Sequence, residues 1–107
     1  MGYEVVHADE VEARHGVFRP LTDPLGVSRF RVNRLELGPG YEGSEHDHTA
    51  DGQEEVYAIV GGSGTLRVDG EEVALRPGHF VFCPPEARRQ MRAGDEGLVY
   101  IGIGAAG

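Results

Sequence analysis

Residues 46–64, HDHTADGQEEVYAIVGGSG, combine a histidine pair, a carboxylate at the head of an apolar run and a glycine-rich segment. If the pair is extended, the imidazoles of His46 and His48 lie on the same side, because side chains alternate along a strand. The same alternation places Glu55 and Tyr57 on one face of the apolar run. Two imidazole nitrogens and one carboxylate that converge are the minimum ligand set of a transition-metal site.

The rest of the chain favours short strands separated by turns. No segment has a long helical period, and turns recur about every 8–12 residues, which is typical of an all-β sandwich or barrel. The glycine-rich residues 61–64 are expected to connect two strands. In residues 27–37 the apolar alternation changes phase, which predicts a bulge or a strand covered on both faces. Further strands are expected at residues 3–7, 79–83, 88–92 and 98–103.

The clearest local signal is the Asp-Gly dipeptide at residues 69–70. Asp-Gly between two alternating runs favours a two-residue hairpin with a type I′ turn. That turn pairs Arg67 with Glu72 on one face and Leu66 with Val73 on the other. Opposite charges would then meet outside, and aliphatic side chains would meet inside.

Composition places the chain among ordinary globular proteins. Its 107 residues, 39% hydrophobic and 26% charged, suffice for one domain with a modest core. The net charge of −8 argues against nonspecific binding to nucleic acid or to an anionic membrane. All ten basic residues are arginine, which excludes lysine chemistry such as a Schiff base.

Targeting and redox signals are sparse. No apolar run approaches the ~20 residues that cross a bilayer, and the N-terminus has no basic or apolar leader. The single cysteine, Cys83, allows no internal disulfide, which suits a reducing compartment. Cys83 has no activating neighbour in the sequence and is expected to be buried. We therefore expect a cytoplasmic protein that binds neither nucleic acid nor membrane.

One segment resembles the first motif of the cupin family, which reads glycine, five residues, His-x-His, a short spacer, glutamate, six residues, glycine. In this chain Gly40 precedes the histidine pair by five residues, and Glu55 is followed after six residues by Gly62. The spacer from His48 to Glu55 has six residues, whereas the family usually has three or four, and a loop tolerates two extra residues. Asp51 in this spacer is expected to face solvent unless the lengthened loop turns it inward.

The second cupin motif is matched only at its start. This motif reads glycine, five residues, Pro-x-Gly, two residues, histidine, three residues, asparagine. Gly78 and Pro84 have the expected spacing, but Glu86, Arg89 and Ala93 stand in place of the glycine, the histidine and the asparagine. The chain therefore has an arginine where metal-binding cupins carry their third histidine.

The resemblance implies an all-β fold, a small double-stranded β-helix or jelly-roll barrel. It covers residues 27–103, the barrel core, and residues 1–107 are expected to form a single cupin domain. Residues 1–26 would add an N-terminal strand and an irregular arm that either wraps its own domain or crosses to a partner subunit. Because a short barrel leaves strand edges that must be covered, we expect a homodimer.

Two states of the histidine site follow from its residues. In the first, His46, His48 and Glu55 hold one divalent transition metal (Fe, Mn, Ni, Zn or Cu) with open positions for substrate or dioxygen. In the second, Arg89 pairs with Glu55 and no metal binds, because a permanently charged guanidinium repels a divalent cation. His79 follows a turn and is expected to be exposed rather than a further ligand.

These states lead to different functions. With a metal, the chain would be an oxygenase or isomerase acting on a small anionic metabolite, and Arg89 and Tyr57 would contact this ligand. Without a metal, it would be a small-ligand-binding or sensing protein in which Arg89 anchors an anion. A third hypothesis is an interaction module whose exposed strands mainly form a dimer.

Overall fold

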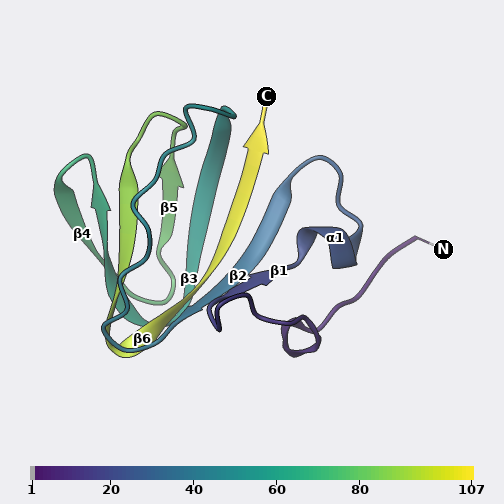
Figure 1. Ribbon diagram of the computed structural model, residues 1–107, viewed down its shortest axis with the longest axis horizontal. Helices are drawn as coiled ribbons and strands as arrows, with labels where there is room; N and C mark the ends of the chain where they lie inside the picture. Colours follow the sequence, from purple (N-terminus) through teal and green to yellow (C-terminus); the bar gives the residue numbers. More distant parts are fainter. Residues whose placement is uncertain (1) are drawn as a thin grey trace.

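Two long antiparallel strands, β3 (Gln53–Val68) and β6 (Arg89–Ala106), run through the centre of the fold. The computed structural model describes residues 2–107, and Figure 1 shows β1 and β2 on one side of this pair and β4 on the other. The strand order is β1-β2-β6-β3-β4, and β5 pairs with β3. The expected all-β fold is confirmed. The other elements are η1 (Ala8–Glu10), β1 (Phe18–Pro20), α1 (Thr22–Leu25), β2 (Arg31–Leu37), β4 (Glu71–Leu75) and β5 (Phe80–Cys83).

Strand β3 changes partner along its length. Its first part pairs with β5 and its second part with β4. The register between β3 and β6 shifts on either side of Gly61 and Gly62, and Gly62 has a φ of 71°, in the left-handed region. A Cβ at Gly62 would lie 2.0 Å from the carbonyl oxygen of Gly97 on β6. Glycine is therefore required where the two strands bend past each other.

Two expectations about this region are wrong. Residues 61–64, expected as a connection, lie inside β3. Residues 88–92 and 98–103 were expected as separate strands, but residues 89–92 and 98–103 belong to the single strand β6. The glycines that suggested turns instead permit close contact between strands. A Cβ at Gly64, for example, would lie 2.4 Å from the carbonyl oxygen of Arg92.

The N-terminal region also differs from the expectation. Residues 3–7 form no strand. His7 caps the turn η1, so the extended backbone ends at this residue. The arm that follows contains β1 and α1, and β1 pairs with β2 of the same chain. Arg19 on β1 donates hydrogen bonds to the carbonyl oxygens of Ala8 and Val11, at 3.4 and 2.7 Å. This part of the arm therefore wraps its own domain.

Strand β2 is shorter than expected and begins at Arg31. It pairs with β6 without a register shift, and successive side chains from Val32 to Glu36 are all partly buried. The change of phase in its sequence therefore reflects a strand covered on both faces and not a bulge.

The hairpin at residues 69–70 is confirmed in type and register. Both turn residues have positive φ, 48° and 86°, as a type I′ turn requires. Arg67 pairs with Glu72, and Leu66 pairs with Val73. Leu66 is fully buried, but Val73 is 44% exposed, because β4 lies at the edge of the sheet.

The core consists of inward-facing side chains, mainly from β3 and β6. Tyr57 and Ile59 are 4% and 3% exposed, and Cys83 is fully buried as expected. Burial raises the pKa of the Cys83 thiol, so it acts as a small apolar group. No helix within residues 2–107 is long and apolar enough to cross a membrane. The buried apolar cluster comprises Leu37, Tyr57, Ile59, Leu66, Leu75, Cys83, Met91, Ala93, Leu98 and Tyr100.

Glu36 links β1 to β2 by charge. Its carboxylate accepts hydrogen bonds from Nε of Arg34 and Nε of Arg19, each at 2.9 Å, and these two contacts lower its pKa. Such a group stabilises the fold above its unfolded pKa of ~4.3 and loses that contribution as the pH falls through its lower folded pKa. Glu36→Gln is therefore expected to reduce the free energy of unfolding by about 1 kcal/mol at neutral pH, and by less in acid.

Urea unfolding of the parent protein and Glu36→Gln at pH 7 and pH 3 measures this difference. Glu72→Gln removes a contact with Arg67 in which both side chains are about half exposed and serves as the control with the smaller expected change. A Glu36→Gln effect that is as large at pH 3 as at pH 7 contradicts the prediction.

Candidate metal centre

The start of strand β6 positions the histidine pair. The N–H of His46 donates to the carbonyl oxygen of Arg89, and the N–H of Arg89 donates to the carbonyl oxygen of His46, each at 2.9 Å. The N–H of His48 donates to the carbonyl oxygen of Pro85 at 2.8 Å. These bonds hold the two imidazoles side by side, with ring centroids 5.3 Å apart and planes at 90°.

Glu55 on β3 completes a three-residue cluster. Its Oε1 lies 3.2 Å from Nε2 of His48 and 3.7 Å from Nε2 of His46. One potential ligand atom from each of the three residues lies within 4.8 Å of the others. The convergence expected from side-chain alternation is therefore present.

Further contacts orient the two imidazoles. Nδ1 of His48 lies 3.0 Å from Oδ1 of Asp51, and Nδ1 of His46 lies 3.3 Å from the carbonyl oxygen of Ser44. An acceptor beside Nδ1 favours the tautomer protonated there and leaves the Nε2 lone pair for a metal. The sequence prediction did not include Ser44, and it placed Asp51 in solvent unless the lengthened spacer turned inward. Asp51 does face solvent, with a side-chain exposure of 49%, and the lengthened spacer also brings its carboxylate to His48. The length of the spacer is therefore the signal that identifies this contact.

Arg89 is almost completely buried, with 1% exposure. All three guanidinium nitrogens donate hydrogen bonds: Nη2 to Oε1 of Glu55 at 2.5 Å, Nε to the Tyr57 hydroxyl at 3.1 Å, and Nη1 to the Ala87 carbonyl oxygen at 2.7 Å. The inward orientation of Arg89 and its ion pair with Glu55 are both present.

Glu55 is ionised in these surroundings. Burial acts to raise the pKa of its carboxyl group, but hydrogen bonds from His46, Tyr57 and Arg89 outweigh burial and lower this pKa to about 2. Tyr57 keeps its proton, because burial and the nearby charge of Glu55 raise its pKa, and its hydroxyl donates to Oε1 of Glu55 at 2.5 Å. The carboxylate is therefore available both as an anionic ligand and as the partner of Arg89.

The donor set fits a divalent transition metal. Two imidazole nitrogens and one carboxylate leave coordination positions open, and the Nδ1 contacts hold the rings in the tautomer that binding needs. The contacts of Glu55 with Arg89, Tyr57 and the two histidines all involve Oε1, so Oε2 takes part in none of them. The three residues could therefore hold a metal ion while Arg89 stays paired.

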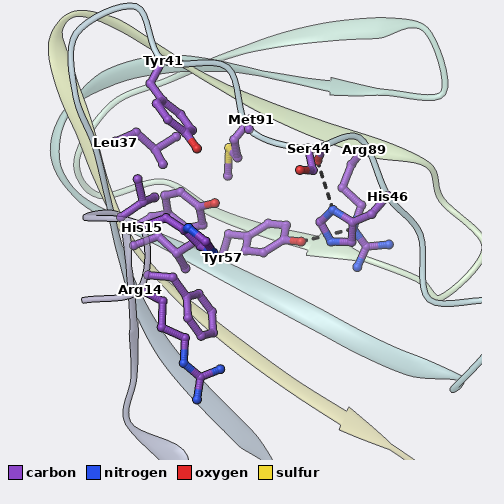
Figure 2. A pocket seen from close by; sticks show the side chains of 14 residues that line it. Arg14, His15, Leu37, Tyr41, Ser44, His46, Tyr57, Arg89 and Met91 are labelled. Carbon is purple, nitrogen blue, oxygen red and sulfur yellow. Dashed lines mark hydrogen bonds between the residues drawn. The ribbon is translucent and has the colours of Figure 1, made fainter. Parts of the chain in front are cut away.

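Two cavities adjoin this cluster. The site cavity, of about 290 Å³, is lined by the three cluster residues and by polar side chains of β2. The apolar cavity, of about 260 Å³, is lined mainly by aromatic and aliphatic groups. Figure 2 shows Tyr57 in the apolar cavity pointing toward Arg89 and His46, with Leu37 and Tyr41 at the other end. The residues that line both cavities are Phe18, Leu35, His46, Tyr57 and Tyr100.

His79 lies outside the cluster, as expected. It is exposed, and its Nδ1 accepts a hydrogen bond from the N–H of Arg76 at 3.1 Å within the turn before β5. This contact explains why His79 follows the turn without reaching the three converging residues.

Comparison with known protein families agrees with this architecture. The family profile described as the cupin domain matches residues 33–104. The chain belongs to the cupin family. A cupin protein from Bacteroides fragilis, known from a crystal structure, has a TM-score of 0.82 and 24% sequence identity, and the match covers 99% of this chain and 86% of that chain. The similarity confirms the small jelly-roll barrel expected from the motifs.

Two similar proteins carry the names of enzymes. A crystal structure of a sugar phosphate isomerase of the cupin superfamily, from Silicibacter pomeroyi, has a TM-score of 0.74 and 26% identity to this cupin, over 84% of this chain and 59% of that chain. A dimethylsulfoniopropionate lyase from Ruegeria pomeroyi is 36% identical over 63 residues, which are 59% of this chain and 40% of the lyase. The cupin chain therefore spans less than half of the length of this curated relative.

This cupin differs from the motif of metal-binding cupins at one central position. Arg89 takes the place of their third histidine in the motif, and its guanidinium donates to Glu55. The cluster therefore has three potential metal-binding groups and a cation beside them, so it can either hold a metal or keep Glu55 paired with Arg89 alone.

Proposed function

We propose that this cupin is a metal-dependent enzyme, an oxygenase or isomerase that acts on a small anionic metabolite. The observation that carries the proposal is the convergence of His46, His48 and Glu55 with their ligand atoms within 4.8 Å of one another. The orienting contacts of both Nδ1 atoms support it, because metal-binding imidazoles are usually held in this way.

Each residue of the site has a defined role in this proposal. The two histidines and Glu55 would hold the metal, which when bound supplies a Lewis acid with open positions for substrate or dioxygen. Tyr57 contacts the ligand from the wall that the two cavities share. Arg89 contributes positive charge beside an anionic ligand while its three nitrogens hold Glu55, Tyr57 and the backbone.

The two named relatives support the substrate class. A sugar phosphate and dimethylsulfoniopropionate are both small molecules with an anionic group. The positive charges of Arg89 and of a bound metal would attract such an anion. The single buried Cys83 fits our prediction of a cytoplasmic protein.

Loss of either histidine is expected to abolish metal binding. Protein purified without a histidine tag or chelator should contain about one transition metal per chain, and His46→Ala or His48→Ala should contain almost none, because two remaining ligands cannot hold the ion tightly. Elemental analysis by inductively coupled plasma mass spectrometry measures the metal content directly.

His79→Ala is the matched control, since it removes an exposed histidine outside the cluster. It is expected to keep the full metal content. Absence of stoichiometric metal from the native protein, together with failure to take up Fe, Mn, Ni, Zn or Cu on reconstitution, would rule out the metal-dependent function.

The alternative is a metal-free binding or sensing protein, which the Arg89–Glu55 ion pair favours. This pair has a separation of 2.5 Å, occupies Oε1 of Glu55, and places a cation beside the positions that a metal would take. In this function the barrel holds a small anionic ligand and Arg89 supplies the anchoring charge. Ligand binding that persists in protein free of metal would support this alternative.

We also propose that the protein is a homodimer. On the outer face of the sheet, Phe80 and Phe82 of β5 are 75% and 57% exposed, and the register places Phe82, Val56 and Ile103 in one row across three strands. Exposed apolar areas of this kind mark interaction surfaces. Light scattering is expected to give twice the chain mass of 11.6 kDa.

Replacement of Phe80 and Phe82 together by serine should then produce a monomer. Val73→Ser, at an apolar position on β4 that is 44% exposed, is the control and should leave the dimer intact. A parent protein that is monomeric at about 10 μM, where an interface of ordinary size holds a dimer together, is the contradicting result.

A further inference from the structure

The inner face of β2 changes from polar to apolar along its length. Its first inward residues, Arg31 and Asn33, line the site cavity, and Leu37 lines the apolar cavity. Leu35 lines both. A ligand that lies along β2 therefore meets polar groups near the metal-binding cluster and aliphatic groups beyond them.

Two glycines of β6 lie opposite the two polar residues. Arg31 is paired with Gly104, and Asn33 is paired with Gly102, and both glycines line the site cavity. A Cβ at Gly102 would reach ordinary contact distance, 3.7 Å, from the ring of Tyr57. A Cβ at Gly104 would lie 2.8 Å from Oε1 of Gln53 and 3.2 Å from Cγ of Glu55. Arg31 and Asn33 therefore face no side chain of β6 itself, and the side chains of β3 close the cavity above the two glycines.

The side-chain oxygen of Asn33 lacks a hydrogen-bond partner among the described residues. Its Oδ1 is buried and has no hydrogen bond to any of residues 2–107. Folded proteins leave few buried acceptors unpaired, and a site built with such a group discriminates in favour of a ligand that can satisfy it. Asn33 also lines the site cavity, and its amide, turned so that Oδ1 faces the cavity, would accept a hydrogen bond from a hydroxyl or N–H of a ligand there.

Arg31 supplies accessible positive charge in the same cavity. It is exposed and forms none of the ion pairs found among residues 2–107, whereas Arg89 is paired with Glu55. Glu55 is the acidic residue in the cavity wall, and Arg89 already balances its charge. The planar guanidinium of Arg31 matches a carboxylate or a phosphate, so the cavity favours an anion.

We propose that Arg31 and Asn33 recognise a small organic anion that carries a hydroxyl group beside its anionic group and a short apolar chain. Arg31 binds the carboxylate or phosphate, and Asn33 accepts a hydrogen bond from the hydroxyl. The apolar chain lies over Leu35 toward the apolar cavity. This inference rests on the proposed function and deepens it by naming the ligand class of the same site.

Calorimetric titration with 2-hydroxyhexanoate tests the inference. Three matched probes each lack one feature: hexanoate lacks the hydroxyl, 1,2-hexanediol lacks the anion and lactate lacks the chain. We expect 2-hydroxyhexanoate to bind about tenfold more tightly than each of them. Equal binding of 2-hydroxyhexanoate, hexanoate and the diol would overturn the inference. Titration with 2-hydroxyhexyl phosphate assigns the anion, since the tighter of the two hydroxylated anions carries the group that Arg31 prefers.

Variants assign the two contacts. Arg31→Gln should weaken 2-hydroxyhexanoate about tenfold and remove its advantage over the diol, and Asn33→Leu should remove its advantage over hexanoate. Arg29→Gln makes the same change of charge at a residue that lines neither cavity and should bind like the parent. Equal losses in Arg31→Gln and Arg29→Gln, or unchanged discrimination in Asn33→Leu, would contradict the assignment.

A second variant at the same position provides the test if Asn33→Leu does not fold. Asn33→Asp keeps the size and an acceptor at this position but adds a negative charge beside Arg31. Asn33→Asp should unfold cooperatively in a thermal scan. It should bind 2-hydroxyhexanoate and hexanoate about tenfold more weakly than the parent does. Binding of the acids equal to that of the parent would contradict a position of Asn33 next to the anion.

The metal content of the same preparations separates this inference from the proposed function. Protein without metal that still prefers 2-hydroxyhexanoate over its matched probes would refute the metal-dependent function and leave the recognition intact. Protein with one metal per chain that binds none of the probes below about 10 mM, a very weak affinity, would refute the recognition and leave the function intact.

Discussion

Replacement of Arg89 by methionine is expected to lower the free energy of unfolding by about 3 kcal/mol, the range measured when one partner of a buried ion pair is removed. Methionine fills much of the space of the arginine stem but donates no hydrogen bond. The carboxylate of Glu55 and the carbonyl oxygen of Ala87 would each lose a donor, in a place where Arg89 is 1% exposed. Urea unfolding of metal-free protein at neutral pH measures the loss.

Two further variants test the cause of that loss. Arg88→Met removes the charge of the preceding, exposed residue and should cost much less, because exposed ion pairs contribute little. In the double variant Arg89→Met/Glu55→Gln the loss should be smaller than the sum of the two single losses, since the uncompensated carboxylate is gone. A loss below about 1 kcal/mol in Arg89→Met, the level of an exposed pair, would show that the ion pair contributes little to stability.

The same variant bears on the two proposed functions. Removal of the guanidinium takes away a cation beside the cluster and frees Oε1 of Glu55, so Arg89→Met should bind a divalent metal about tenfold or more tightly than the parent. If the parent also binds metal, the metal-dependent enzyme is supported. If only the variant binds metal, the native chain is the metal-free protein and Arg89 is the reason.

The parts of this fold that the sequence predicts are those determined by local rules. The type I′ hairpin depends on two adjacent residues with positive φ, and its register followed correctly. The inward face of Glu55, Tyr57 and Ile59 depends on alternation within one strand, and the structure has it. Alternation likewise predicts that the two imidazoles share one side and that Glu55 faces inward. Their meeting also depends on the pairing of His46 with Arg89 at the start of β6.

The parts that the sequence does not predict depend on contacts between distant segments. The inward position of Asn33 depends on its pairing with a glycine of β6. Composition alone could not distinguish Arg31 from the other arginines, because its role follows from the cavity that it lines. Residues 3–7 have the alternation of a strand, but a strand also needs another strand to pair with, and no strand among residues 2–107 pairs with them.

The glycine-rich residues 61–64 were expected to form a turn, because their close contact with the distant strand β6 is not visible in the sequence. Gly62→Ala is expected to lower the free energy of unfolding by about 3 kcal/mol or more, because a strained backbone and a steric clash act together. The φ of Gly62 is 71°, and a Cβ there would lie 2.0 Å from the carbonyl oxygen of Gly97. One of the two long strands would have to move. Urea unfolding, or loss of soluble folded protein, measures the effect.

Gly61→Ala is the matched control, one residue away in the same strand. A Cβ at Gly61 would meet the side chain of Val99 at 3.5 Å, an ordinary contact, and the φ of Gly61 is not positive. Its effect should be within about 1 kcal/mol of zero, because the lower entropy of the unfolded chain offsets any small strain. If the two glycines served only as a flexible turn, both substitutions would cost the same small amount. Unequal losses therefore identify Gly62 as the point where β3 and β6 cross too closely for a side chain.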